Sequence, residues 1–492
     1  MSLTKHWPIL IIFLFGFFLR TMYLPSGAVP FSYDQARDAY TIKDLLSGDL
    51  KIQGPPTSTR DFFHGVLYYY ALAPGYWLGH GSPLVATAWM ALLNSAGIFL
   101  AYYIGQRLFH NRFHAALLAL LYAISYEQTQ YSLYLTNTAL ATVTVPTLYF
   151  GLWLWRQGHR LGPVLSGLAA GLSFQANFLL IYHLAVVTAS LVFRLLPVSK
   201  KAITGFLLAF LVASSTMWLS EIKFGLPSLA GPASLLTRSS YSTLHITSQI
   251  IADTAVNQFV RLVGLNLLPQ APQIATLFFM ILFIIFSFRH RPSWWWLFAL
   301  GLVGFAPALI LGGISSPYIH VGLGSLVLVF AIYFASRTTP LILVPVILAN
   351  IAYVTEINPT GRTEFAIQKT MTLSHELAAI DYIYAQAEGQ PFSISTIAAP
   401  LNINTTWSYL FNWYGREKYG YLPYWHGADQ SGQSGDNLSR PGPTAHYFLI
   451  IEPSQGLPED LINSKVAEEN KLSNFNHKKQ FGEITVHNRT RK

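Results

Sequence analysis

The sequence contains no cysteine among its 492 residues. This absence excludes disulfide bonds, thiol catalysis and zinc sites with cysteine ligands, and it leaves the redox compartment undetermined. Charged residues are also scarce, at 11% of the chain, whereas soluble domains contain about 25%. Such a deficit is expected where much of a chain faces lipid, because charges are costly inside a bilayer.

Hydrophobic residues make up 52% of the chain and aromatic residues 15%, with 12 Trp and 27 Tyr. This composition is typical of aromatic belts at a membrane interface and of surfaces that stack on sugars. The net charge is +9, but no basic run stands on a soluble domain. We therefore interpret the basic residues as loop charges that orient a membrane protein, and we expect no nucleic-acid partner.

The hydrophobic runs predict about eleven membrane-spanning helices. The first run begins near Pro8 and ends near Leu24, and because no small-residue cleavage site follows it, we interpret it as a helix rather than a signal peptide. Most other runs approach the roughly 20 residues that cross a bilayer. Two of them, 113–126 and 162–176, are short, which leaves the count open by one or two. The ten later runs are 84–106, 113–126, 137–155, 162–176, 179–196, 202–220, 272–289, 294–312, 318–336 and 339–355.

Basic residues occur in alternate loops, as the positive-inside rule requires. No Lys or Arg occurs in the intervening loops 127–136, around 177 and 313–317. The pattern places the N-terminus in the cytoplasm and the segments 25–83, 221–271 and 356–492 on the opposite face. The basic loop residues are Lys5, Arg107, Arg112, Arg156, Arg160, Arg194, Lys200, Lys201, Arg289, Arg291 and Arg337.

Two domains follow from this map. Residues 1–355 form the transmembrane domain, with a first outer loop at 25–83 and a second at 221–271. Residues 356–492 are polar enough to fold in water, with a helix-like stretch at 364–388, strand-like stretches at 392–399 and 446–453, and a Gly/Ser/Asp/Pro-rich loop at 427–444. The predicted fold class is an all-α polytopic membrane protein with a small C-terminal extracytoplasmic α/β domain. The aromatic stretch 404–425 is expected either to pack this domain or to bind a glycan.

The first outer loop contains the stretch FSYDQARDAY (31–40). Ser32 and Gln35 form a helix-start pattern, which predicts a helix from Tyr33 to about Leu46. Asp34 and Asp38 then stand one turn apart. An acid in a first helical turn also favours the helix dipole, so a structural role for Asp34 stays open. For Asp38 the structural alternatives are a solvated helix face or a partner for Arg37. Further along the same loop, Arg60, Asp61 and His64 precede the aromatic run Tyr68–Tyr70.

These elements together resemble a known group. Leu19-Arg20 at the end of the first span, the sequence DQAR (34–37) and the sequence HGVLYYY (64–70) resemble the bacterial GT-C glycosyltransferases. The resemblance is to the dolichyl-phosphate-mannose-protein mannosyltransferase and aminoarabinose-transferase-like families, and it covers residue 1 to about 355. It implies a polytopic enzyme that takes a sugar from a polyprenyl-phosphate carrier in the outer leaflet.

The resemblance also implies roles for individual residues, with departures. The first-loop acid of the family matches Asp34, but the usual Asp-Glu pair is here Asp34-Gln35. The His/Lys-Pro-Pro-Leu-Tyr-Tyr element matches residues 64–69 without either proline. A Ser-Arg followed by Asn in related chains matches Ser132, Leu133 and Asn137, so the arginine is absent. FQAN (174–177) matches a short outer turn.

A polyprenyl-phosphate leaving group departs without a proton, so one base suffices. Asp34 is our candidate base, with inversion at the anomeric carbon. The departing phosphate needs cations, for which Arg is best suited. Arg238, Arg261 and His64 are further candidates, although contact with lipid headgroups is the favoured interpretation for the two arginines. The tyrosines suit either a substrate groove or an aromatic belt. The substrate-binding candidates are Arg37, Asp38, Arg60, Asp61, His64, Tyr68, Tyr69 and Asn137.

We expect no cofactor and no metal, with a divalent ion shared by Asp34 and Asp38 as the alternative. Three residues receive no catalytic role: His183 and His320, interpreted as packing or interfacial residues, and Glu127, interpreted as interfacial. The expected partners are a polyprenyl-phosphate sugar donor, an acceptor lipid, glycan or protein, and the lipid bilayer. The expected location is a bacterial or archaeal plasma membrane.

Alternative functions stay open at this point. A lipid transporter or flippase would be expected to carry ionisable residues near the bilayer midplane and paired repeats, neither of which is evident. A non-catalytic scaffold with a GT-C-like fold is favoured by the missing family residues. Oligosaccharide transfer to asparagine would call for a clearer metal site.

Overall fold

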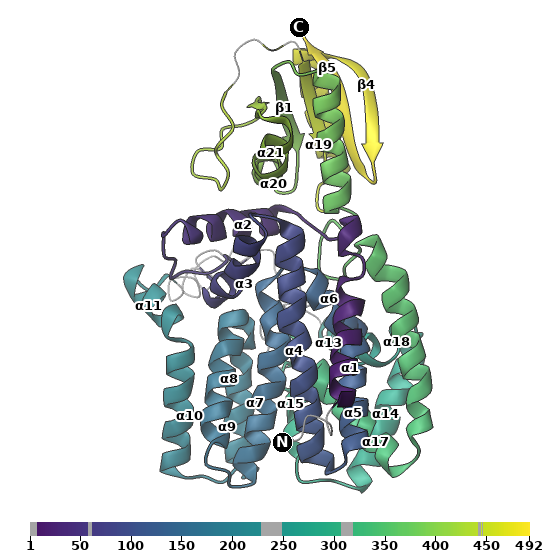
Figure 1. Cartoon of the computed structure of the whole chain (residues 1–492). Helices are drawn as coiled ribbons and strands as arrows, with labels where there is room; N and C mark the ends of the chain where they lie inside the picture. The colour runs from purple at the N-terminus through teal and green to yellow at the C-terminus, as the bar shows by residue number, and fades with distance from the viewer. Residues whose placement is uncertain (1–6, 58–61, 228–247, 307–317, 441–443, 445) are drawn as a thin grey trace.

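The computed structural model describes the chain except for residues 1–6, 58–61, 228–247, 307–317, 441–443 and 445. A helical bundle forms the body, and a small α/β unit stands on one end of it (Figure 1). The helices of the bundle are α1 (Trp7–Thr21), α4 (Pro83–Phe109), α5 (Arg112–Ile124), α7 (Ala141–Arg156), α8 (Gly162–Ala176), α9 (Tyr182–Val192), α10 (Lys200–Ala213), α13 (Ser248–Leu267), α14 (Gln273–Arg289), α15 (Trp295–Val303), α17 (Gly324–Arg337) and α18 (Val344–Ile357).

The long apolar helices run side by side in this bundle. Helix α8 packs between α7 and α10, while α4 packs against α1, α3 (Leu67–Leu78) and α5. Among the described residues, four helical segments are long and apolar enough to cross a membrane. They are Trp7–Ser26, Pro83–Phe109, Asn137–Arg156 and Pro340–Thr360. Several other predicted runs form shorter apolar helices, such as Arg112–Ile124 and Gly324–Arg337.

Three predicted segments differ from the structure. The run 202–220 is not one straight helix, because α10 and α11 (Ser215–Lys223) meet at an angle of 59°. The run 318–336 becomes helical only at Gly324. The segment 221–271, expected as an outer loop, contains the 20-residue helix α13, which packs against α14, α17 and α18. Its polar composition hid this helix, because its polar side chains serve contacts inside the bundle.

Short helices close the end of the bundle that faces the α/β unit. Helix α2 (Tyr33–Leu46) runs across this end, roughly perpendicular to the long helices, with α3 below it (Figure 1). The observed bounds of α2 confirm the helix predicted from Ser32 and Gln35. Helix α6 (Tyr126–Leu133) lies beneath the same end, and all eight of its residues are buried although most are polar. The short helices η2 (Leu24–Ser26), η3 (Asn137–Leu140) and η4 (Phe178–Ile181) connect longer ones.

The C-terminal unit is a five-stranded mixed sheet in the order β2-β1-β3-β5-β4. Strand β1 is parallel to β2 and β3, and β5 is antiparallel to β3 and β4. Helix α19 (Leu373–Ala387) packs against the β4–β5 hairpin. The small α/β unit is confirmed, but this polar hairpin was not predicted. The strands are β1 (Phe392–Ile397), β2 (Tyr424–Trp425), β3 (His446–Ile451), β4 (Ser473–Phe481) and β5 (Ile484–Arg491), and the remaining helices are η5 (Pro340–Leu343), η6 (Asn358–Thr360), α20 (Thr405–Leu410), η7 (Phe411–Gly415), α21 (Arg416–Tyr419) and α22 (Glu459–Leu472).

Hydrogen bonds attach this unit to the bundle. The backbone N–H of Leu373, in the first turn of α19, donates to the carbonyl of Val29 at 2.9 Å. This bond joins α19 to the segment between α1 and α2. The hydroxyls of Tyr40 and Ser408 lie 2.9 Å apart, joining α2 to α20. The packing role expected for stretch 404–425 is confirmed for Trp407, which is completely buried in the unit, whereas Trp413 is only partly buried.

Candidate active site

The first turn of α2 is fixed by one glutamine. The Ser32 backbone N–H donates to Gln35 Oε1 at 3.1 Å, which forms part of a capping box. Gln35 Nε2 in turn donates to the carbonyl of Leu135 at 2.9 Å. A glutamate, which the resembling families have here, lacks this donor. Gln35 is therefore a structural residue that orients α2, and its neighbours on the helix are positioned accordingly.

Arg37 bridges the two aspartates of α2. Its Nη1 lies 2.7 Å from Asp34 Oδ1, and its Nη2 lies 2.8 Å from Asp38 Oδ1. The Tyr69 hydroxyl donates to the same oxygen of Asp38 at 3.3 Å. The Asp34 side chain is 59% exposed, whereas that of Asp38 is only 5% exposed. The structure thus assigns the solvent-accessible carboxylate to Asp34, and the solvated face considered for Asp38 is wrong.

The buried position of Asp38 governs its protonation. Burial raises the pKa of Asp38 to about 6, and the opposing effect of Arg37 does not cancel this rise. For Arg37, burial acts against the charge, but Asp38 and Asp34 outweigh it and raise the pKa. Arg37 therefore stays a cation, held by one buried and one exposed carboxylate.

His64 lies near Arg37 but does not act as a second cation. Its Nδ1 accepts a hydrogen bond from the backbone N–H of Phe178 at 3.3 Å. Burial, followed by the charge of Arg37, lowers the pKa of His64 to about 4. The imidazole is therefore neutral at pH 7, and its contribution to phosphate binding is limited to a neutral hydrogen bond.

The FQAN turn connects His64 to Asn137. The Gly65 backbone N–H donates to the Gln175 carbonyl at 2.8 Å, and the Asn137 side-chain amide donates to the Ala176 carbonyl. The motifs that were matched separately in the sequence thus meet in one place. Asn137 is half-buried and anchors η3 to the end of α8.

Arg261 belongs to a second group, which we call the Phe365 cluster: Phe365, Tyr131, Tyr134, Tyr318 and Arg261. The ring of Phe365 stacks on Tyr131 at 4.3 Å and lies 5.5 Å from Tyr318. The guanidinium of Arg261 lies 6.0 Å from the Phe365 ring centre and donates to the Glu364 carbonyl at 3.3 Å. The guanidinium of Arg261 thus packs against this aromatic cluster.

The Phe365 cluster borders Asp34. Burial raises the pKa of Tyr134 and of Tyr318, and the charge of Asp34 adds to the rise in both. Arg261 has the opposite effect on the pKa of Tyr318. Both charges therefore act electrostatically on the Tyr318 phenol.

The other candidates divide as follows. Tyr69 contacts Asp38 directly, and Tyr68 is buried beside it, with ring centres 5.9 Å apart. Arg60, Asp61 and Arg238 lie outside the described residues. Within the described ranges, no three His, Asp or Glu side chains group as metal ligands would.

The sequence did not predict that two charges of the bundle, Arg20 and Glu127, are buried. Arg20 is fully buried, and its guanidinium donates to the carbonyls of Ala123 at 2.6 Å and Tyr122 at 3.2 Å, at the C-terminal end of α5. Glu127 is also fully buried rather than interfacial: Asn266 Nδ2 donates to its Oε2 at 2.6 Å, and His320 Nδ1 lies 3.3 Å from its Oε1. The only sequence signal was a run of polar residues, YEQTQYS, between two apolar segments.

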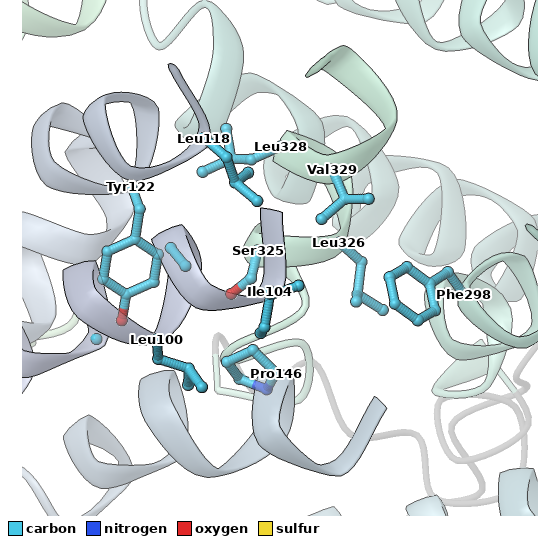
Figure 2. Close-up of a pocket in the computed structure, with 12 residues that line it drawn as sticks. Leu100, Ile104, Leu118, Tyr122, Pro146, Phe298, Ser325, Leu326, Leu328 and Val329 are labelled. Carbon is cyan, nitrogen blue, oxygen red and sulfur yellow. The ribbon is translucent and has the colours of Figure 1, made fainter. Parts of the chain in front are cut away.

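The bundle also contains an apolar cavity of about 20 Å³ (Figure 2). Leu100, Ile104, Leu326 and Phe298 point into it, with Ser325 and Tyr122 as the polar contributors. Such a space holds about one water molecule. It belongs to the packing of the bundle, and the charged residues described above lie elsewhere.

Comparison with solved structures identifies the architecture. The structure of ArnT from Cupriavidus metallidurans bound to undecaprenyl phosphate matches with a TM-score of 0.59 and 12% identity, over 99% of this chain and 98% of that chain. The fold is that of ArnT. The apo state of ArnT from the same organism matches with a TM-score of 0.57, 12% identity and the same coverage. ArnT is a GT-C aminoarabinose transferase, so the GT-C fold expected from the sequence is confirmed, including the C-terminal unit that the sequence resemblance did not reach. No family model and no curated protein matches the sequence.

Proposed function

We propose that this chain is a membrane glycosyltransferase that moves a sugar from a polyprenyl-phosphate donor to an acceptor hydroxyl. The observation that carries the proposal is the pairing of one exposed carboxylate, Asp34, with the half-buried cation Arg37 at the end of a membrane bundle. The fold supports it, because the ArnT structure that matches over the whole chain is bound to undecaprenyl phosphate. The proposed donor is accordingly a sugar linked to a polyprenyl phosphate.

In the proposed reaction Asp34 acts as general base. The acceptor oxygen attacks the anomeric carbon and forms the new C–O bond, while its proton passes to the Asp34 carboxylate. The bond between the anomeric carbon and the phosphate oxygen breaks, and its electron pair leaves with the phosphate. Attack from the opposite side to the leaving group inverts the configuration. Arg37 holds the Asp34 carboxylate in place through its 2.7 Å contact.

The leaving phosphate gains negative charge as it departs, and the two arginines supply the compensation. Arg37 is already held by two carboxylates. Arg261 has no ion pair among the described residues and donates only to a backbone carbonyl. Arg261 is therefore the better proposed phosphate ligand, since its remaining N–H groups are available for two phosphate oxygens.

We further propose that this end of the bundle faces the outside of a plasma membrane, with the N-terminus in the cytoplasm. The alternation of basic loops supports this orientation. The acceptor is then an extracytoplasmic lipid, glycan or protein hydroxyl, and no metal takes part. Transfer occurs at the level of the lipid headgroups, where the phosphate of the carrier lies.

The test is release of sugar from a panel of polyprenyl-phosphate sugars by purified protein in nanodiscs. We expect wild type to turn over a donor and Asp34→Asn to be slower by about 10²–10⁴-fold, the usual contribution of a general base. Donor binding should persist in Asp34→Asn. EDTA should leave the rate unchanged, and a loss of activity restored by Mg²⁺ or Mn²⁺ would contradict metal-free transfer.

The alternatives predict different results in the same experiment. If wild type turns over no donor but moves a labelled polyprenyl phosphate between leaflets, the chain is a transporter. If it binds the lipid without either activity, it is a non-catalytic scaffold.

A further inference from the structure

A second polar site lies between the C-terminal unit and the helices α2 and α3. It is a cleft of about 530 Å³. The residues that matter for its chemistry are Lys43, Tyr76, His80, Asn412, Trp413 and Arg416. Asp34, Arg37 and Arg261, which the proposed reaction uses, do not line this cleft. The proposed reaction therefore assigns no role to the cleft.

Contacts between the unit and the bundle hold the walls of this cleft. The Tyr409 hydroxyl donates to the carbonyl of Gly81 at 2.7 Å. Gly81 has a φ of +89°, and a Cβ at this position would lie 3.1 Å from Trp413 Cδ1. Gly81 thus allows the turn after α3 to press against Trp413. On the other wall, Tyr40 joins α2 to Ser408 at 2.9 Å.

The cleft carries an excess of positive charge. Lys43 and Arg416 are exposed, and neither has an ion pair among the described residues. Lys418, two residues beyond Arg416, differs because it pairs with Asp381 at 2.9 Å. Glu417 is the single acid among the lining residues. Free Lys and Arg side chains facing one space favour an anion.

The hydroxyl of Tyr76, unpaired within the described part of the chain, is a second observation that favours a bound ligand, independent of the charges of Lys43 and Arg416. The residue lines the cleft and is 3% exposed, and its buried hydroxyl has no hydrogen-bond partner among the described residues. A buried hydroxyl without a partner is costly, which is the expected state of a group that a ligand completes. Asp38 lies close enough to act electrostatically on the same phenol.

We propose that this cleft binds the acceptor, and that the acceptor is an anionic saccharide carrying a phosphate or a carboxylate. The proposal rests on the glycosyltransferase function proposed above. Lys43 and Arg416 bind the charged group, Trp413 offers an aromatic face to the sugar ring, and Asn412 and Tyr76 offer hydrogen bonds to its hydroxyls. A few convergent polar groups in a largely preformed, aromatic-lined cleft are typical of specific ligand sites.

The first measurement is binding to the full-length protein in nanodiscs without any donor. The probes are maltose, maltose 1-phosphate, a glucuronosyl disaccharide and a phosphorylated disaccharide anchored to lipid in the same nanodisc. We expect the charged probes to bind at least tenfold more tightly than maltose, and added salt to weaken them. Binding of the soluble charged probes shows that the saccharide alone is recognised, and binding of the anchored probe alone shows that the lipid contributes as well.

The variants Lys43→Gln/Arg416→Gln and Trp413→Ala should each weaken the charged probes about tenfold or more. Lys418→Gln is the matched control, since its side chain is engaged by Asp381, and its affinity should equal that of wild type. In transfer assays the double variant should raise the KM for the charged acceptor far more than it lowers kcat. Thermal unfolding of each variant verifies that it is folded.

Equal affinity for maltose and its phosphate, or equal affinity of wild type and the folded double variant, would overturn the proposal. Because this binding is measured without a donor, it is independent of the proposed reaction. Failure of wild type to release sugar from every donor would instead refute the proposed function. The two failures are therefore distinguishable.

Discussion

At the scale of single residues, the two arginines near Asp34 have opposite surroundings. Arg37 is held by Asp34 and Asp38 within 2.8 Å of each. Arg261 stacks on Phe365 and bonds to a carbonyl, so most of its hydrogen-bonding capacity stays unused by the described residues. The first arginine orients the carboxylate, whereas the second is available for a phosphate.

This difference predicts the effect of Arg261→Gln. Loss of a charged hydrogen bond to phosphate costs about 1.5–3 kcal/mol, so undecaprenyl phosphate should bind about 10–100-fold more weakly. Arg291→Gln is the control, because Arg291 is exposed and stacks on Phe288 at 4.3 Å near the end of α14. Affinity is measured by titrating the lipid into protein in nanodiscs. Unchanged affinity in Arg261→Gln would mean that the residue only packs against Phe365.

At the scale of elements, the buried polar helix α6 joins segments that are distant in sequence. Glu127 contacts Asn266 of α13 and His320 in the turn before α17. The Tyr126 backbone N–H donates to Asn350 of α18 at 2.9 Å. Gly324 lets α17 approach, since a Cβ there would lie 2.5 Å from Glu127 Oε2. These bonds place Arg261 and Tyr318, which stand on two of the joined segments.

Glu127→Gln should therefore destabilise the bundle. Asn266 Nδ2 donates to one carboxylate oxygen, and His320 Nδ1 lies 3.3 Å from the other. Glutamine offers a single acceptor, so either Asn266 loses its acceptor or an amide N–H₂ without a buried acceptor replaces the other oxygen. A buried unpaired donor costs about 1–3 kcal/mol. The expected result is a lower Tm of the protein in detergent. Glu356→Gln, which alters an exposed carboxylate bonded to Gln270, is the control and should leave the Tm unchanged. A Tm equal to wild type in Glu127→Gln would contradict this account of α6.

At the scale of the whole molecule, the C-terminal unit contains two buried carboxyl groups. Glu452 accepts hydrogen bonds from Trp407 Nε1 at 3.0 Å and from the Ala399 backbone N–H at 2.9 Å. Burial nevertheless raises the pKa of Glu452 to about 7. Glu376 has no hydrogen-bond partner among the described residues, and burial, then the charge of Glu452, raises the pKa of Glu376 well above its usual value of 4.5.

Both shifts make the stability of the unit fall as pH rises. The folded chain keeps protons on these groups where the unfolded chain has lost them, so unfolding releases protons above about pH 4.5. For Glu452 the decrease spans pH 4.5 to about 7. Glu376→Gln removes the free-energy cost of keeping the buried Glu376 carboxyl protonated at high pH. Its Tm should therefore exceed that of wild type by about 2 °C or more at pH 8 and by less at pH 5.

Scanning calorimetry at both pH values measures this difference. Glu452→Gln should lower the Tm at pH 8, because three donors point at its carboxylate: Gln368 Nε2, Trp407 Nε1 and the Ala399 N–H. Glu459→Gln, which alters an exposed residue of α22, is the control and should leave the Tm unchanged at both pH values. A uniform loss of Tm in Glu376→Gln at both pH values would show that its carboxyl is not protonated in the fold.

The sequence by itself determined the membrane body, the GT-C fold and the helix that carries Asp34, Arg37 and Asp38. Hydrophobic runs and capping patterns are local properties, and they predicted α2 to the residue. Local patterns failed where polar residues serve tertiary contacts, as in α13, α6 and the β4–β5 hairpin. Such segments look like loops because their partners are remote in sequence.

Only the tertiary structure decided which of two neighbouring aspartates is accessible. It buried Asp38 under Tyr69 and left Asp34 open, although one helical turn separates them. It likewise brought Arg261 to Phe365 and placed Lys43 and Arg416 in the lining of one cleft, across more than 100 and 370 residues of chain respectively. Burial and long-range contacts depend on how whole helices pack, and no local pattern contains that information.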